Sequence, residues 1–361
     1  MALPPILCVV GPAGSGKTAL LERLIPALRA GGVKAGGVTQ CSGDGPADPA
    51  GKDAARLARA GARPSIAASP TDLTVQSAAA CPPLLDLAAE FCADCDLVLA
   101  EGFERSPFDK ILLMPSGSSC RPEGGWESVG LVVGDRTGVP PGAVGRDDLG
   151  MIVEWTRNWM QRRRRLGRGL MGAILVGGQS RRMGSDKAAM RVGGRPVLPR
   201  LAELLATRTD DVWTIGRPVP GVGLPRCVRW HPDLRPGGGP LAGIATALRG
   251  ASAAGQEAVL AIACDMPRLT LDVVDFLLEG RRPDRPATAI RNPATGYVEP
   301  LAAVYETSSL PEIEQALDAG ERSVTTVLER LAAHVVEAPA ALAEFLANVN
   351  RPEELKDIDR R

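Results

Sequence analysis

The chain has 361 residues, which is enough for two domains of ordinary size. Its 42 basic residues balance 42 acidic residues, so no overall field would draw it to nucleic acid or to a membrane. Only 3% of the residues are aromatic, which argues against stacking platforms for single-stranded nucleic acid and leaves the core to aliphatic side chains.

The N-terminus reads MALPPILCVV and runs directly into a glycine-rich loop. It carries no basic segment and no cleavage signal, so it predicts a first β-strand rather than a signal peptide. No apolar run in the sequence approaches the roughly 18 residues that a membrane-spanning helix needs. We therefore expect a cytoplasmic protein that binds neither nucleic acid nor membrane.

The first half of the chain alternates predicted strands and helices. ILCVV is followed by the helix TALLERLIPALRA, which Gly31 and Gly32 end, and then by the short strand VKAGGVT. Further helices are predicted at 50–60 and 83–92, strands at DLVLAEG, KILLM and SVGLVVG, and a helix at DDLGMIVEWTRNWMQRRRR. Apolar strands separated by helices predict a three-layer α/β domain with a mostly parallel sheet buried on both faces.

Eight cysteines are scattered along the chain, which argues against a disulfide framework. Cys92 and Cys95 form a C-x-x-C pair, but neither His231 nor His334 is near enough in sequence to complete a zinc site. We interpret the pair as ordinary thiols at a helix end.

Residues 11 to 18, GPAGSGKT, fit the phosphate-loop pattern G-x-x-x-x-G-K-[ST]. Glycines let the backbone N–H groups converge on phosphate oxygens, Lys17 supplies charge for the β and γ phosphates, and the Thr18 hydroxyl is a ligand for Mg²⁺. Glu101, which ends the strand DLVLAEG, is expected to face the metal. The nucleotide-binding residues predicted in this half are Gly11, Gly14, Ser15, Gly16, Lys17 and Thr18.

GPAGSGKTALLERLIPALRAGG, PAGKDAARLARAGA and DLVLAEGF together resemble MobB, the GTP-binding adaptor of molybdenum cofactor biosynthesis, over about residues 5 to 115. The resemblance implies a P-loop NTPase fold that binds GTP. The histidine-rich stretch that the family has after its second strand is replaced by GGVTQCSGDGPAD, so its role is not carried over. A small-molecule kinase or a non-enzymatic adaptor stays open for this half.

QRRRRLGRG, residues 161 to 169, ends the last helix of the first half. We interpret it as a helix C-terminus and exposed linker, because cations suit the negative end of a helix dipole. This places the domains at 1–166 and 167–361. The second half again alternates, with strands at 171–177, DVWTIG, CVRWH, AVLAIACD, ATAIRN and YVEPLAAVY, helices at 196–207, LAGIATALRG, LDVVDFLLEG and PEIEQALDAG, and a last helix after RPEEL.

The second half opens with LVGGQSRRMGSDKA, which has neither G-K-[ST] nor G-x-G-x-x-G. Its glycines permit close approach of backbone amides to a base and to phosphates. Arg181, Arg182 and Lys187 match the charge of a nucleoside triphosphate from which pyrophosphate leaves. Asp265 and Asp233 end two strands, where carboxylate oxygens suit Mg²⁺; Asp233 could instead cap the next turn.

LVGGQSRRMGSDKA, GPLAGI, CDMP, EPLAAVY and NVNRPEEL together resemble molybdenum cofactor guanylyltransferase, MobA, over almost all of residues 170 to 361. The resemblance implies a Rossmann-like nucleotidyltransferase fold and a preference for guanine. It implies that Asn348 and Asn350 reach the pterin; from the residues alone they could also be turn formers. Where the family often has a nucleotide-contacting asparagine, this chain has Ile215 and Gly216. The residues implied to hold Mg-GTP are Leu175, Val176, Gly177, Gly178, Ser180, Lys187, Asp233 and Asp265.

The two loops thus predict different tasks. For the second domain, the resemblance implies transfer of GMP from GTP to the terminal phosphate of molybdopterin, and we expect Lys187, Arg181, Arg182 and Asp265 to act on the reacting phosphates. The first is a GTP-binding accessory domain, at most a weak GTPase. A cytidylyltransferase or a sugar-phosphate nucleotidyltransferase remains the alternative. Expected partners are GTP, molybdopterin and apo-molybdoenzymes or their chaperones, and homo-oligomers are allowed.

Overall fold

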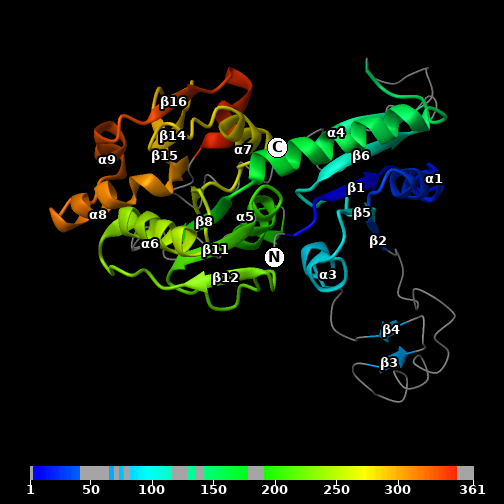
Figure 1. Ribbon diagram of the computed structural model, residues 1–361, viewed down its shortest axis with the longest axis horizontal. Coiled ribbons are helices and arrows are strands. Elements are labelled where there is room, and N and C mark those ends of the chain that lie inside the picture. Colours follow the sequence, from blue (N-terminus) through cyan, green and yellow to red (C-terminus); the bar gives the residue numbers. More distant parts are fainter. Residues whose placement is uncertain are drawn as a thin grey trace.

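The computed structural model describes residues 3–40, 65–68, 73–76, 82–115, 128–134, 142–177, 191–192 and 194–347. Two α/β domains lie side by side, and helix α4 (Leu149–Gly167) runs along the first domain and ends beside the second (Figure 1). Within these residues, no helix combines the length and the apolar character that crossing a membrane requires.

The first domain is built on a five-stranded sheet in the order β2-β5-β1-β6-β7, in which every pairing is parallel. Aliphatic side chains from β1 point alternately to two cores: Leu7 and Val9 pack with α1 and α4, whereas Cys8 and Val10 pack with α3. The strands are β1 (Ile6–Val10), β2 (Ala35–Thr39), β5 (Leu97–Glu101), β6 (Asp109–Met114) and β7 (Val129–Gly134), and the helices are α1 (Lys17–Ala30), α3 (Leu84–Phe91) and α4.

The predicted three layers of the first domain are therefore confirmed. The helix expected at 50–60 lies outside the described residues. A short antiparallel hairpin, β3 (Ser65–Ala68) with β4 (Leu73–Gln76), was not anticipated by the sequence patterns.

The second domain has a seven-stranded sheet in the order β12-β11-β8-β13-β15-β14-β16. Helices α5 and α7 cover one face, and α6, α8 and α9 cover the other. The strands are β8 (Leu170–Val176), β11 (Asp211–Gly216), β12 (Val228–His231), β13 (Ala258–Ala263), β14 (Ala287–Arg291), β15 (Val298–Glu306) and β16 (His334–Glu337); the helices are α5 (Val197–Ala206), α6 (Gly239–Ala253), α7 (Leu271–Glu279), α8 (Leu310–Asp318) and α9 (Val324–Arg330).

This second sheet is mixed, so the second domain does not simply repeat the all-parallel sheet of the first. β15 runs antiparallel to both of its neighbours, β13 and β14. The connection from β14 to β15 is a tight turn with Gly296 at φ 69°, and a connection this short can only join antiparallel strands. The sequence patterns also did not anticipate α9, β16, the short pair β9 (Arg191–Val192) and β10 (Arg195–Pro196), or the 3₁₀ helices η2 (Thr307–Ser309) and η3 (Ala340–Leu346).

A buried cluster of charges joins the two domains. The guanidinium of Arg208, which follows α5, donates to Asp109 of β6 at 3.1 and 3.2 Å and to Asp275 of α7, and only 1% of its side chain is exposed. Burial alone would lower the pKa of Arg208, but the two carboxylates outweigh it and the pKa is raised. Asp109 also accepts from Trp159 at 3.1 Å and Arg163 at 3.3 Å, both on α4.

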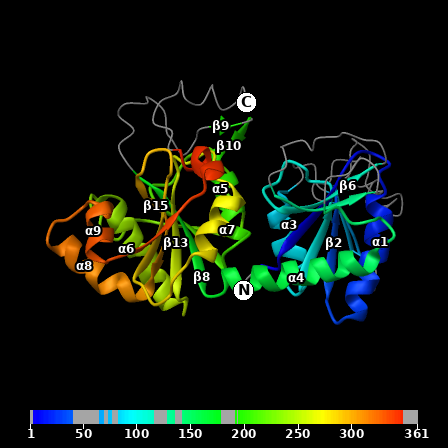
Figure 2. The same cartoon turned by 90° about the horizontal axis from the view of Figure 1, so that it is seen from above.

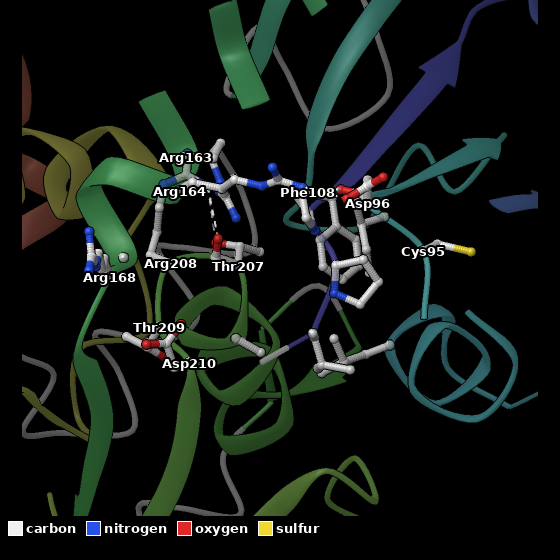
Figure 3. Close-up of a pocket in the computed structure, with 17 residues that line it drawn as sticks. Cys95, Asp96, Phe108, Arg163, Arg164, Arg168, Thr207, Arg208, Thr209 and Asp210 are labelled. Carbon is white, nitrogen blue, oxygen red and sulfur yellow. Dashed lines mark hydrogen bonds and ion pairs between the residues drawn. The ribbon is translucent and has the colours of Figure 1, made fainter. Parts of the chain in front are cut away.

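The basic segment forms the C-terminal end of α4, as expected, but it is not a free linker, because three of its arginines pair with carboxylates. Arg163 is buried against Asp109, Arg162 pairs with Glu279 of the second domain, and Arg164 pairs with Asp96 of the first. Arg163, Arg164 and Arg208 line a cavity of about 340 Å³ between the domains (Figure 3). Arg162 therefore reaches across to the second domain, whereas Arg163 and Arg164 hold the end of α4 against the first.

Arg208→Met is expected to destabilise the protein by about 3–5 kcal/mol, because it removes a buried cation that pairs with both Asp109 and Asp275. Urea unfolding of the full chain, followed by tryptophan fluorescence, measures the loss, and limited proteolysis near residue 167 reports separation of the domains. The matched control is Arg282→Met, because Arg282 pairs only with the exposed Asp284 and its loss should leave the midpoint unchanged. Equal effects of the two changes would contradict this account.

Candidate functional site

The glycine-rich loop of the first domain lies between β1 and α1, where it can hold a phosphate. Lys17 donates from Nζ to the carbonyls of Gly11 at 2.8 Å and Pro12 at 2.9 Å, so its ammonium lies over the loop. A Cβ on Gly11 would come within 2.5 Å of the Leu113 carbonyl, so only glycine fits there. α1 begins at Lys17 without a side-chain cap, which leaves its first N–H groups to an anion.

Thr18 and Glu101 meet beside this loop. The Thr18 hydroxyl lies 2.9 Å from both carboxylate oxygens of Glu101, which ends β5 next to β1. One hydroxyl and one carboxylate on the same side of a phosphate loop are the oxygen ligands that Mg²⁺ takes. The residues present fit that ion.

Two residues that the sequence patterns did not indicate also contact this loop. Glu104 accepts from the backbone N–H of Gly11 at 3.3 Å, and Arg146 donates to the carbonyls of Ser15 at 2.6 Å and Met114 at 2.8 Å. Glu104 could have been noticed from its place three residues after Glu101, but no local motif marks Arg146, which arrives from just before α4. The buried Ser15 hydroxyl has no hydrogen-bond partner among the described residues.

In the second domain, the candidate residues lie where β8 and β13 end. Leu175 pairs with Ala263, and Asp265 follows two residues later at a half-buried turn, so its backbone emerges beside Gly177. β8 lies between β11 and β13 in the sheet, so the strands that follow it in the chain are added on both of its sides. Ligands of open α/β sheets bind at the carboxyl ends of the strands at such a point. The end of β8, where Leu175, Val176 and Gly177 were expected to contact the nucleotide, therefore lies next to the turn that carries Asp265.

Asp233 has a different environment, in the loop between β12 and α6. Its Oδ1 accepts from the backbone N–H of Arg235 at 3.3 Å and the Thr246 hydroxyl at 3.3 Å. Burial raises the pKa of this carboxyl above its usual range, and the two hydrogen bonds oppose that rise. The hydrogen bond from Thr246 ties the Asp233 loop to α6. In the described ranges, no group of three or more His, Cys, Asp or Glu is arranged to hold a metal.

Several predicted residues fall outside the described residues, and the structure says nothing of them. They are Gly178, Ser180, Arg181, Arg182, Lys187, Asn348 and Asn350. The C-x-x-C pair is described: Cys92 is buried at the C-terminal end of α3, Cys95 is half-buried, and both are free thiols.

Comparison with known proteins places both domains. Residues 172–353 match the family described as the MobA-like NTP transferase domain, and residues 6–123 match molybdopterin guanine dinucleotide synthesis protein B. Probable molybdenum cofactor guanylyltransferases from Opitutus terrae and Deinococcus radiodurans are 36% and 38% identical to the chain, each over 53% of it and 95% of the relative.

Among solved structures, molybdopterin-guanine dinucleotide biosynthesis protein A from Archaeoglobus fulgidus is 28% identical, with a TM-score of 0.42, and covers 53% of this chain and 97% of its own. The two family matches fall on different domains, and the sequence matches cover 95% of each of the two guanylyltransferases. The chain therefore belongs to the MobA-like NTP transferase family through its second domain and carries a MobB domain in front of it.

Proposed function

We propose that the second domain is a guanylyltransferase that joins GMP from GTP to the terminal phosphate of molybdopterin. One oxygen of that phosphate attacks the α-phosphorus of GTP, the bond from the α-phosphorus to the bridging oxygen breaks, and pyrophosphate leaves. The observation that carries the proposal is the position of Asp265 beside Gly177, at the switch point of the sheet, in a domain 36–38% identical to probable molybdenum cofactor guanylyltransferases.

The backbone at the end of β8 would hold the nucleotide. Leu175 and Val176 lead to Gly177, whose Cα faces open space, so a ligand can approach the chain closely there. α6 begins at Gly239 on the same edge, with Pro240 in its first turn, and its positive end favours phosphate. A Cβ on Gly243 would meet Leu175 at 3.0 Å, so this glycine lets α6 lie close against β8.

We further propose Asp265 as the principal carboxylate for Mg²⁺ in the second domain, and Asp233 as a weaker candidate. When bound, Mg²⁺ would neutralise phosphate charge. Arg181, Arg182 and Lys187 are proposed to supply cations to the same phosphates, and Asn348 and Asn350 to contact the pterin. Gly178 and Ser180 are proposed to complete the nucleotide loop.

The first domain is proposed to bind GTP through Lys17 and Thr18, with Gly11, Gly14, Ser15 and Gly16 forming the loop and Glu101 with Thr18 holding Mg²⁺. Its partners would be apo-molybdoenzymes or the chaperones that deliver cofactor to them. No step of guanylyl transfer needs this domain, because the second domain has its own glycine edge and carboxylates.

The assay of the function is pyrophosphate release by the full chain with molybdopterin and Mg²⁺, supplied with GTP, CTP or ATP. GTP should be the preferred donor, and the pterin product should gain the mass of GMP. Preference for CTP would move the protein to the cytidylyl branch, and release that does not depend on molybdopterin would reject the proposed acceptor.

Asp265→Ala is expected to reduce transfer by at least about 10²-fold, the scale of one preorganised electrostatic contact in a transition state. Asp233→Ala should cost less, because Asp233 is already engaged by Thr246 and the Arg235 amide. Pyrophosphate release by the two variants, after circular dichroism shows that both fold, tests this order. Equal losses, or a larger loss for Asp233→Ala, would contradict the expected order.

Lys17→Ala is expected to abolish GTP binding by the first domain, since the variant lacks the ammonium that lies over the loop. Guanylyl transfer by the same full-length variant should stay within about twofold of the wild type, a change well under 1 kcal/mol. Pyrophosphate release and reconstitution of an apo-molybdoenzyme are measured on one preparation. Arg29→Ala, a solvent-facing change in the last turn of α1, is the control. A tenfold fall in pyrophosphate release would mean that the first loop takes part in the chemistry.

A further inference from the structure

An exposed indole lies at the open edge of the second sheet. Trp230 belongs to β12, the outermost strand, and 45% of its surface is exposed, which makes it one of five large hydrophobic side chains in the described residues that face solvent. Its Nε1–H donates to the carbonyl of Gly216 at 3.0 Å. The hydrogen bond fixes the direction of the ring while leaving an aromatic surface in water.

The ring leans toward the carboxyl edge of the sheet. The Trp230 backbone is level with Thr214 of β11, but its indole reaches Gly216, two residues further along that strand. At Gly216, φ is 115° and a Cβ would lie 2.2 Å from the Val176 carbonyl, so the end of β11 is pressed directly against the end of β8. The Trp230 indole therefore lies beside the joined ends of β11 and β8.

The end of β12, which carries Trp230, is at a suitable distance from the proposed phosphate site at the end of β13. Strands β13, β8, β11 and β12 are consecutive in the sheet, and neighbouring strands lie about 4.8 Å apart, so three spacings give about 14 Å between the ends of β13 and β12. That span is on the order of the length of an extended nucleoside triphosphate. Phosphates held at Asp265 would place the base of the same nucleotide over β11 and β12.

The second tryptophan near this edge, Trp213, already has both of its neighbours within the protein. Trp213 is buried on the opposite face, stacked on His231 with ring centroids 3.5 Å apart, and Arg229 lies over the same indole at 5.5 Å. Its surfaces are covered by its own neighbours. Trp230 carries the open aromatic face at the ends of β11 and β12.

We infer that Trp230 is the stacking platform for the purine base of the donor nucleotide, an inference that rests on the proposed guanylyl transfer. A purine offers a larger ring surface than a pyrimidine, so stacking on indole favours GTP over CTP. The ring is fixed before the nucleotide arrives, which reduces the entropy lost on binding. Trp230 would contribute to nucleotide affinity and to base choice, while the phosphate chemistry belongs to other residues.

The test uses the full chain with Lys17→Ala, so that only the second domain binds nucleotide. Trp230→Leu keeps an apolar side chain and removes the aromatic face, whereas Trp230→Phe keeps a smaller aromatic face. Mg-GTP should bind about tenfold more weakly to the Leu variant, within the range measured for losing one base–aromatic stack, and within about threefold of wild type to the Phe variant. Mg-CTP should change less than Mg-GTP.

Catalysis should show the same division. KM for GTP should rise with the loss of affinity, while kcat stays within about twofold, because the aromatic contact is equal in ground state and transition state. Quenching of tryptophan fluorescence by GTP should fall in both Trp230 variants. Phe91→Leu, an aromatic side chain 56% exposed on the first domain, is the matched control and should change none of these quantities.

The outcomes separate this inference from the proposed function. If wild-type protein transfers GMP and Trp230→Leu binds GTP as tightly as wild type, the platform is wrong and the function stands. A change in sedimentation of Trp230→Leu with unchanged GTP affinity would make the ring a contact between copies and would also overturn it. If the wild type transfers CMP rather than GMP, the proposed function fails and the purine platform fails with it. If no nucleotide is transferred but GTP affinity still falls selectively in Trp230→Leu, the function alone fails.

Discussion

The guanidinium of Arg208 is the contact on which the arrangement of the two domains depends. It is held between Asp109 of the first domain and Asp275 of the second, with its side chain 1% exposed. Burying these charges is costly, and the cost is offset only when the donors and acceptors all find partners. The planar fork of arginine allows this, because its N–H groups make four hydrogen bonds to the two carboxylates, one more than the three donors of a lysine ammonium could supply. The pairing specifies one relative placement of β6 and α7.

That placement fixes how the strands of the two sheets are oriented relative to each other. The cavity beside Arg208 is lined by Pro5 and Ile6 at the start of β1 and by Thr209 and Asp210 at the start of β11. The amino ends of both sheets therefore meet at one place, and their carboxyl ends point away from it on the same side of the molecule (Figure 2). Both candidate nucleotide sites are at carboxyl ends and therefore lie on the same side of the molecule.

Local patterns predicted most of the helices and strands and the first nucleotide loop, because those features depend on near neighbours in the chain. GPAGSGKT specifies its own turn, and Glu101 is marked by the end of a hydrophobic strand. Long-range pairing was missed. Nothing near Arg208 in the sequence shows that Asp109, 99 residues away, is its partner, and a run of arginines was interpreted as a solvated linker. The direction of β15 was missed for the same reason, since alternating apolar residues do not say which strand they pair with.

The two nucleotide sites differ in what is ready before a ligand arrives. In the first, Lys17 is bonded to its own loop and Thr18 to Glu101, so phosphate must replace contacts that already satisfy these groups. In the second, the described edge of β8 and β11 consists of closely packed backbone, because a Cβ on Gly216 would collide with the Val176 carbonyl. Rigid backbone recognises shape and hydrogen-bond pattern, whereas a lysine recognises charge. The described part of the second site is therefore suited to recognise shape, and its charge recognition is proposed to come from Arg181, Arg182 and Lys187, whereas the first site recognises charge through Lys17.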